Sequence, residues 1–238
     1  MSPPAVSSVP YTLLATGEGL GMSDFWLYGW LRRAAAMIAH LVVIAFTVFL
    51  LVMSRPGSSL FSWHPVCMSL AFCLGMTEGI LLFSHESSPL CLWSHKTKVR
   101  LHWILQALVL TAAITGLVLI VSNKNLTEQP HLVSWHSVLG IVTLAATCGQ
   151  GLYGLLLLFP GLIKNCSAAR LKLYHATSGL LCYMLATVTV VLAMYSGWFQ
   201  AQINGTAWYI CVVAPFYPAL VVMNQITSAY LPRRKVDI

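Results

Sequence analysis

Six long apolar runs constrain the fold of this chain more than any other feature of its sequence. They cover roughly residues 33–53, 61–83, 101–121, 133–159, 171–195 and 207–230. Each run is long enough to cross the ~30 Å hydrocarbon layer of a bilayer as one helix. Only 8% of the 238 residues are charged and 58% are apolar, whereas about a quarter of an average soluble domain is charged. We therefore predict an all-α membrane protein with six transmembrane helices, and we exclude an ordinary soluble globule.

The basic residues fall almost entirely on one side of these spans. Six spans place both termini on the same side, together with the second and fourth loops. The Lys and Arg residues on that side are Arg32, Arg33, Lys96, Lys98, Arg100, Lys164, Arg170, Lys172, Arg233, Arg234 and Lys235. The opposite side holds only Arg55 and Lys124. The positive-inside rule therefore predicts cytoplasmic termini, and the net charge of +7 needs no nucleic-acid partner to explain it.

The six spans define one membrane domain with two short flanks. Residues 1–30 are rich in Ser, Pro and Gly and lack the basic start and cleavage pattern of a signal peptide. We expect them to form a cytoplasmic N-terminal tail without regular structure. Residues 31–232 are expected to form the six-helix domain, and residues 233–238 a basic cytoplasmic tail. Pro215 and Pro218 predict a kink in the sixth helix.

Four histidines recur once per helix, close to the starts of the second to fifth spans. They are His64, His102, His136 and His175, at intervals of 38, 34 and 39 residues. Successive helices run in opposite directions. The second and fourth spans therefore start on the non-cytoplasmic side, and the third and fifth start on the cytoplasmic side. The sequence thus predicts two histidine pairs, one in each leaflet.

Two neutral imidazoles that face each other across a four-helix core are typical axial ligands of a b-type haem. Zinc takes four protein ligands, or three and a water, and no Cys or carboxylate accompanies these pairs. The chain has no Cys-x-x-Cys-His motif, which excludes covalent c-type attachment. We therefore expect helices 2–5 to form a four-helix core that holds two b-type haems. The alternative is that these are interfacial histidines beside an aromatic belt.

The segments around these histidines resemble one known family. They are SRPGSSLFSWHP at 54–65, LHW at 101–103, HLVSWHS at 131–137 and LKLYHATSG at 171–179. Together they are similar to the cytochrome b561 family, and most similar to its short cytochrome b561 domain-containing members, over about residues 30–235. One departure concerns the Arg-rich stretch that marks ascorbate contacts in the longer, granule-type members. The corresponding residues 94–100 read SHKTKVR in this chain.

The resemblance implies a cofactor set and an activity. It implies that His64 and His136 bind a non-cytoplasmic haem b, and that His102 and His175 bind a cytoplasmic haem b. Members of the family pass electrons from cytoplasmic ascorbate across the membrane to monodehydroascorbate or ferric iron, as ascorbate-dependent transmembrane oxidoreductases. Their setting is the endoplasmic reticulum or another endomembrane or vesicle. The expected partners are these small molecules and the lipid bilayer, without nucleic acid, and a homodimer is left open.

Basic residues precede the cytoplasmic histidines and form a candidate donor site. Lys98 and Arg100 lie shortly before His102, and Lys172 lies shortly before His175. Such a patch attracts an anion such as ascorbate, or pairs with haem propionates. We therefore take Lys98, Arg100 and Lys172 as candidate substrate-binding residues. The alternative is that they only follow the positive-inside rule and bind lipid headgroups.

Other polar residues and one rival function complete the expectations. His40 stands alone on the first span, where we expect a core histidine with satisfied hydrogen bonds. Glu78 is the only acidic residue within a span, and either snorkels or carries a proton. His131 is expected to be a solvated loop residue. The alternative function is a multi-pass transporter or channel with interfacial histidines and no haem.

Overall fold

The structure is a computed structural model that describes residues 22–84, 93–159 and 167–230. Six helical segments in it are long and apolar enough to cross a membrane. They are Trp26–Ser54, Trp63–Leu81, His95–Leu126, Trp135–Leu158, Ala168–Ala193 and Gly205–Tyr230. All six predicted spans are confirmed, and the described residues contain no strand.

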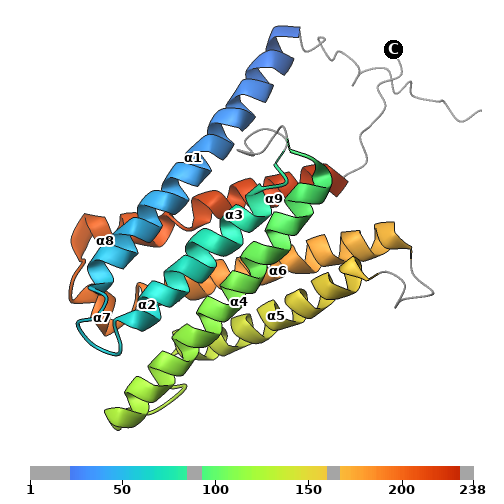
Figure 1. The fold of residues 1–238 in the computed structure, drawn as a ribbon. Coiled ribbons are helices and arrows are strands. Elements are labelled where there is room, and N and C mark those ends of the chain that lie inside the picture. Colours follow the sequence, from blue (N-terminus) through green and yellow to red (C-terminus); the bar gives the residue numbers. More distant parts are fainter. Residues whose placement is uncertain (1–21, 85–92, 160–166, 231–238) are drawn as a thin grey trace, which may run out of the picture.

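The helices follow one another along the chain as Figure 1 shows. They are α1 (Met22–Ser54), α2 (Trp63–Met68), the π-helix η2 (Ser69–Gly75), α3 (Met76–Leu81), α4 (His95–Leu126), α5 (Trp135–Leu158), α6 (Ala168–Ala193), α7 (Gly197–Gln200), α8 (Gly205–Val213) and α9 (Phe216–Tyr230). The first helix begins at Met22, within the residues that we expected to form a tail. Residues 1–21 and 233–238 of the expected tails lie outside the described residues.

Four spans make up the centre of the bundle. The α2–η2–α3 span packs against α4, α4 packs against α5, and α5 packs against α6. The first span, α1, packs on η2 and α9 at the outside of this core, as Figure 1 shows. The predicted core of helices 2–5 is therefore present. Large apolar side chains such as Leu152 and Leu181 point outward and are 66% and 72% exposed, as expected for residues that face lipid.

Small residues allow the helices to approach one another closely. The main buried cluster takes one alanine from each of five spans, and each of them is at most 3% exposed: Ala39, Ala71, Ala113, Ala186 and Ala219. Helix association in lipid depends on close packing rather than on a hydrophobic driving force, so small residues are favoured at such contacts. The same cluster contains the larger side chains that fill the remaining space, among them Met76, Val109 and Tyr183.

The second span is not a uniform α-helix. Seven π-helical residues, Ser69–Gly75, separate α2 from α3. A π-helical segment inserts extra backbone into a helix and is frequent at functional sites. It ends where α4 comes very close, because a Cβ built on Gly75 would lie 2.8 Å from Val109 Cγ2. The apolar pattern of the sequence predicts a continuous helix here and gives no sign of this segment.

The sixth span is broken where a kink was predicted. The described helix α8 ends at Val213 and α9 begins at Phe216. Pro215 lies between them and has no backbone N–H to continue the helical hydrogen bonds. The predicted kink in this span is therefore confirmed at Pro215, whereas Pro218 lies within α9.

Serine caps set the starts of three spans that carry the histidines. Ser94 accepts a hydrogen bond from Thr97 N at the start of α4, and Ser167 accepts one from Arg170 N at the start of α6. Ser134 and Ser137 form a capping box at the start of α5. Side-chain caps of this kind satisfy backbone N–H groups that have no partner within the helix. They therefore fix how far each histidine lies from the start of its helix.

Candidate functional site

The first histidine pair joins the beginnings of α2 and α5. The rings of His64 and His136 have centroids 6.3 Å apart and are inclined by 82°. His64 Nδ1 lies 2.9 Å from the carbonyl oxygen of Gly116 on α4, and His136 Nδ1 lies 3.0 Å from that of Thr189 on α6. Each ring nitrogen must donate, because a carbonyl oxygen only accepts. Both rings therefore leave Nε2 unprotonated and able to bind a metal.

The second pair joins α4 and α6 at the other end of the core. The rings of His102 and His175 also have centroids 6.3 Å apart, inclined by 87°. His102 Nδ1 donates to the carbonyl oxygen of Gly79 on α3 over 2.8 Å. Within the described residues, His175 Nδ1 is buried without a hydrogen-bond partner. The two rings of this pair are thus held differently.

The His175 ring, whose Nδ1 has no hydrogen-bond partner in the described residues, stacks against the ring of Tyr153. The Tyr153 ring lies parallel to the His175 ring, with 6° between their planes and 5.7 Å between their centroids. The Tyr153 hydroxyl donates to the carbonyl oxygen of Leu171 over 3.2 Å. Because Leu171 lies one turn before His175 on α6, this bond ties Tyr153 to the helix that carries the histidine. Tyr153 therefore positions the His175 ring.

The spacing within each pair fits a single metal ion between the two rings. A bond from a metal to an imidazole nitrogen is ~2.0 Å long, and the nitrogen lies ~1.1 Å from the centre of its own ring. Two imidazoles on opposite sides of one ion therefore have ring centres about 6.2 Å apart. Both pairs have 6.3 Å. In the described residues no group of three or more His, Cys, Asp or Glu side chains could hold a metal.

The two pairs lie at different membrane depths. Gly116, which holds His64, and His102 are fourteen residues apart on α4. At 1.5 Å per residue this places the pairs ~21 Å apart along the helix axis. Thr189, which holds His136, and His175 have the same separation on α6. The four predicted histidines therefore come together as two pairs, one toward each end of a core that spans a ~30 Å layer.

The candidate donor residues gather at the end where α4 and α6 begin. Lys98 is half-buried and Arg100 is exposed, both in the first two turns of α4. Lys172 is exposed in the second turn of α6. The positive end of each helix dipole adds to the attraction of these side chains for an anion. Of the other basic residues predicted on this side, Lys164, Arg233, Arg234 and Lys235 lie outside the described residues.

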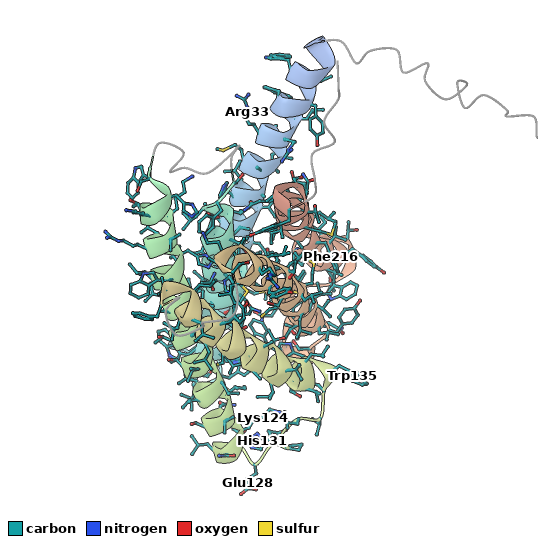
Figure 2. All side chains as sticks on the ribbon, turned by 90° about the vertical axis from the view of Figure 1, so that its right-hand side faces the viewer. Arg33, Lys124, Glu128, His131, Trp135 and Phe216 are labelled. Carbon is teal, nitrogen blue, oxygen red and sulfur yellow. The ribbon has the colours of Figure 1, made fainter. Side chains whose placement is uncertain are left out.

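The opposite end of the molecule carries little positive charge. Figure 2 shows Lys124 and His131 together at the end of the molecule that lies farthest from Arg33. Lys124 Nζ donates to the carbonyl oxygen of Pro130 over 2.7 Å, and His131 Nε2 donates to Asn125 Oδ1 over 2.8 Å. The hydrogen bonds of both side chains thus stabilise their own loop. His131 is exposed, as expected.

One polar contact inside the membrane was not predicted from the sequence. His40 does not stand alone, because its Nδ1 lies 2.7 Å from Glu78 Oε2 on α3. The similar depth of His40 and Glu78 in the membrane could have indicated this contact. Glu78 lies one turn before the end of its span, and α1 runs alongside, so a histidine on α1 comes within its reach. Glu78 therefore contacts a histidine inside the membrane, and extension of its side chain to the membrane surface is not its only means of stabilisation.

Comparison with known proteins gives a consistent result. A family model described as eukaryotic cytochrome b561 matches residues 63–200, a segment that contains all four histidines. A protein of Mus musculus named probable transmembrane reductase CYB561D1 is 59% identical over 209 residues, which cover 88% of this chain and 91% of that protein. Transmembrane reductase CYB561D2 of Mus musculus is 46% identical over 211 residues, 89% of this chain and 95% of that protein.

A plant protein extends the similarity to greater evolutionary distance. Transmembrane ascorbate ferrireductase 1 of Arabidopsis thaliana is 30% identical over 171 residues, which cover 67% of this chain and 69% of that protein. The family model spans more than half of the chain, and the two mouse proteins are similar over nearly its whole length. With six membrane spans and two facing histidine pairs, the chain therefore belongs to the eukaryotic cytochrome b561 family.

Proposed function

We propose that this chain is a di-haem transmembrane reductase that takes electrons from cytoplasmic ascorbate and passes them across the membrane to monodehydroascorbate or ferric iron. The observation that carries the proposal is the presence of two facing histidine pairs with equal ring spacing, ~21 Å apart along the core. Membership in the cytochrome b561 family implies haem b. The number of haems and their ligands, His64 with His136 and His102 with His175, are part of the proposal.

The names of the relatives support a reductase that uses ascorbate. The mouse relatives are called transmembrane reductases, and the Arabidopsis relative is called a transmembrane ascorbate ferrireductase. Two further relatives, both of Zea mays, are called ascorbate-specific transmembrane electron transporters. These names favour ascorbate as the donor for this chain. They leave monodehydroascorbate and ferric iron as the two candidate acceptors.

The residues of the chain provide ligands, orientation and an anion-attracting entrance. Bound haem would supply a one-electron carrier at each end of the core. His64 with His136, and His102 with His175, would each hold one haem through their Nε2 atoms, and a haem held by two histidines would transfer electrons without binding oxygen or substrate. Lys98, Arg100 and Lys172 attract the ascorbate anion to the cytoplasmic end. Both histidine pairs lie within one chain, so this function does not require a homodimer.

The charge asymmetry supports the direction of electron flow. The basic residues of the first turns of α4 and α6 lie at the end of the molecule that we propose to be cytoplasmic, with both termini. Lys124 and Glu128 lie at the other end, as Figure 2 shows. By resemblance to its family, we propose the endoplasmic reticulum or another endomembrane as the location of the protein.

The proposal is tested on purified protein in detergent. Haem extraction and quantification should give two non-covalent haems b per chain. The dithionite-reduced spectrum should show the sharp bands of haem with two histidine ligands, and ascorbate alone should reduce part of the haem. A chain that purifies folded and without haem would refute the proposal and leave the transporter as the better account.

A further inference from the structure

A partly buried histidine–carboxylate pair lies inside the membrane beside the proposed cytoplasmic histidines. His40 Nδ1 lies 2.7 Å from Glu78 Oε2 and 3.0 Å from Glu78 Oε1. The side chains of His40 and Glu78 are only 12% and 24% exposed. Ionisable groups within a span are costly and usually serve function. The proposed function assigns roles to the four histidine ligands and to the basic residues at the cytoplasmic end. It assigns none to His40 and Glu78.

The pair is connected to His102 through the backbone of α3. Glu78 and Gly79 are consecutive residues, and the Gly79 carbonyl accepts the hydrogen bond from His102 Nδ1 over 2.8 Å. The described helix ends at Leu81, one turn beyond Glu78. The carboxylate therefore lies at about the depth of His102 and close to the proposed cytoplasmic surface, from which a proton can reach it.

Other titratable groups lie on the elements packed around the pair. In the described residues they include Arg32 of α1, Cys73 of η2, His102 of α4, Tyr183 of α6 and Tyr217 of α9, all of them buried or partly buried. The Tyr183 hydroxyl lies 3.0 Å from Thr77 Oγ1. Guanidinium, thiol and phenol groups ordinarily keep one protonation state around neutral pH. The histidine–carboxylate pair of His40 and Glu78 is the remaining candidate for taking up a proton.

We propose that His40 and Glu78 form a proton-binding site linked to the redox state of the cytoplasmic haem, an inference that rests on the proposed function. One-electron oxidation of the ascorbate monoanion yields the monodehydroascorbate radical anion, one electron and one proton. The electron is accounted for by reduction of one ferric iron to ferrous iron. The proton is accounted for by neutralisation of the Glu78 carboxylate within the pair. The charge of the region is then the same before and after the transfer.

The physical basis of the link is the low dielectric constant of the membrane interior. An electron added near His102 makes the region more negative, which raises the proton affinity of a neighbouring carboxylate far more than it would in water. Linkage is reciprocal, so a proton on the pair raises the electron affinity of the haem by the same free energy. The pair therefore makes the midpoint potential of this haem depend on pH.

Potentiometric titration of the purified holoprotein between about pH 5 and 8 tests the link. We expect the midpoint potential of the cytoplasmic haem to fall as pH rises, by up to about 59 mV for each tenfold drop in proton concentration. The other haem should change much less. In Glu78→Gln the cytoplasmic haem should lose this dependence and stay near the wild-type value at low pH. The matched control, Glu128→Gln, changes an acidic residue at the far end of the molecule and should titrate as wild type.

A second measurement on the wild-type protein does not depend on the folding of a variant. The infrared difference spectrum between reduced and oxidised protein should contain the C=O stretch of a protonated carboxyl group that appears on reduction. A wild-type potential that does not change with pH, a Glu78→Gln protein with the wild-type pH dependence, or the absence of this band would each overturn the link. Wild-type protein without haem would instead refute the proposed function, so the two failures are distinguishable.

Discussion

At the scale of single residues, the four histidines differ in what holds their Nδ1 atoms. His64, His102 and His136 each donate to a backbone carbonyl on a neighbouring helix. His175 instead lies against the Tyr153 ring. A hydrogen bond to Nδ1 fixes the tautomer and raises the basicity of the ligating nitrogen. As the proposed ligands of one haem, the rings of His102 and His175 would therefore be unequal, whereas those of His64 and His136 would be alike.

The first prediction concerns the ring ligands. His64→Ala and His136→Ala should each lose the same haem, and His102→Ala and His175→Ala the other, because each iron needs both of its rings. Haem quantification with redox titration of the four variants checks this. If any two of them retain both haems in full amount, the ligand assignment is wrong.

The second prediction concerns Tyr153. Replacement Tyr153→Leu removes both the stacked ring and the hydroxyl, whereas Tyr153→Phe removes only the hydroxyl. Aromatic contacts contribute about 0.5–1.5 kcal/mol beyond their buried area, so we expect Tyr153→Leu to weaken retention of the cytoplasmic haem by roughly 2-fold to 10-fold. Tyr153→Phe should have a smaller effect.

Haem dissociation measured by transfer to an apo-globin checks this second prediction. The matched control is Tyr174→Leu, which changes an exposed neighbour of His175 and should bind haem as wild type does. Equal haem loss in Tyr153→Leu and the control would show that the stacked ring does not position His175.

The third prediction concerns the donor site. Lys98→Gln, Arg100→Gln or Lys172→Gln should weaken ascorbate binding by about 1.5–3 kcal/mol where the contact is direct. This corresponds to a loss of affinity of roughly 10-fold to over 100-fold, with unchanged haem content. A long-range effect should be smaller and should fade as salt is added. Stopped-flow reduction by ascorbate at several salt concentrations separates these cases, and wild-type kinetics in all three variants would place the donor elsewhere.

At the scale of helices, depth and direction could be read from the sequence, but lateral contacts could not. Successive histidines of the four are separated by about one span and one loop. Because neighbouring helices run in opposite directions, this spacing was enough to predict which rings share a leaflet. The π-helical segment Ser69–Gly75 depends on packing against α4 and has no local sequence code. His40 and Glu78 lie on different helices. Their contact could be predicted only if the rotation of each helix about its own axis were known, and the sequence does not give these rotations.

The fourth prediction tests this packing. In Gly75→Ala the new Cβ would lie 2.8 Å from Val109 Cγ2 and 3.1 Å from the carbonyl oxygen of Leu70. Overpacking of this kind costs about 1–3 kcal/mol, so the variant should unfold at lower temperature. The matched control is Gly149→Ala on α5, where no atom lies within 4 Å of the new Cβ. Thermal unfolding of both variants in one detergent checks this, and equal stability would mean that the close approach at Gly75 is not limiting.

At the scale of the whole molecule, the fold places two histidine pairs at two depths and gathers basic side chains at one end of the bundle. Four antiparallel spans bring the beginnings of α2 and α5 to one end and those of α4 and α6 to the other. The charge asymmetry favours the orientation that we propose for this core, with the basic end cytoplasmic. In the proposed function, the direction of electron flow would depend on this orientation, and electron transfer itself would depend on both histidine pairs.

The most direct test uses wild-type protein reconstituted into sealed vesicles with ascorbate trapped inside and a ferric chelate or monodehydroascorbate outside. We expect reduction of the external acceptor when the cytoplasmic end faces the lumen of the vesicle, and its loss in both His64→Ala and His102→Ala. Loss in both variants is expected because each removes one of the two carriers in series. Reduction across the membrane that continues at the wild-type rate in either variant would contradict the account.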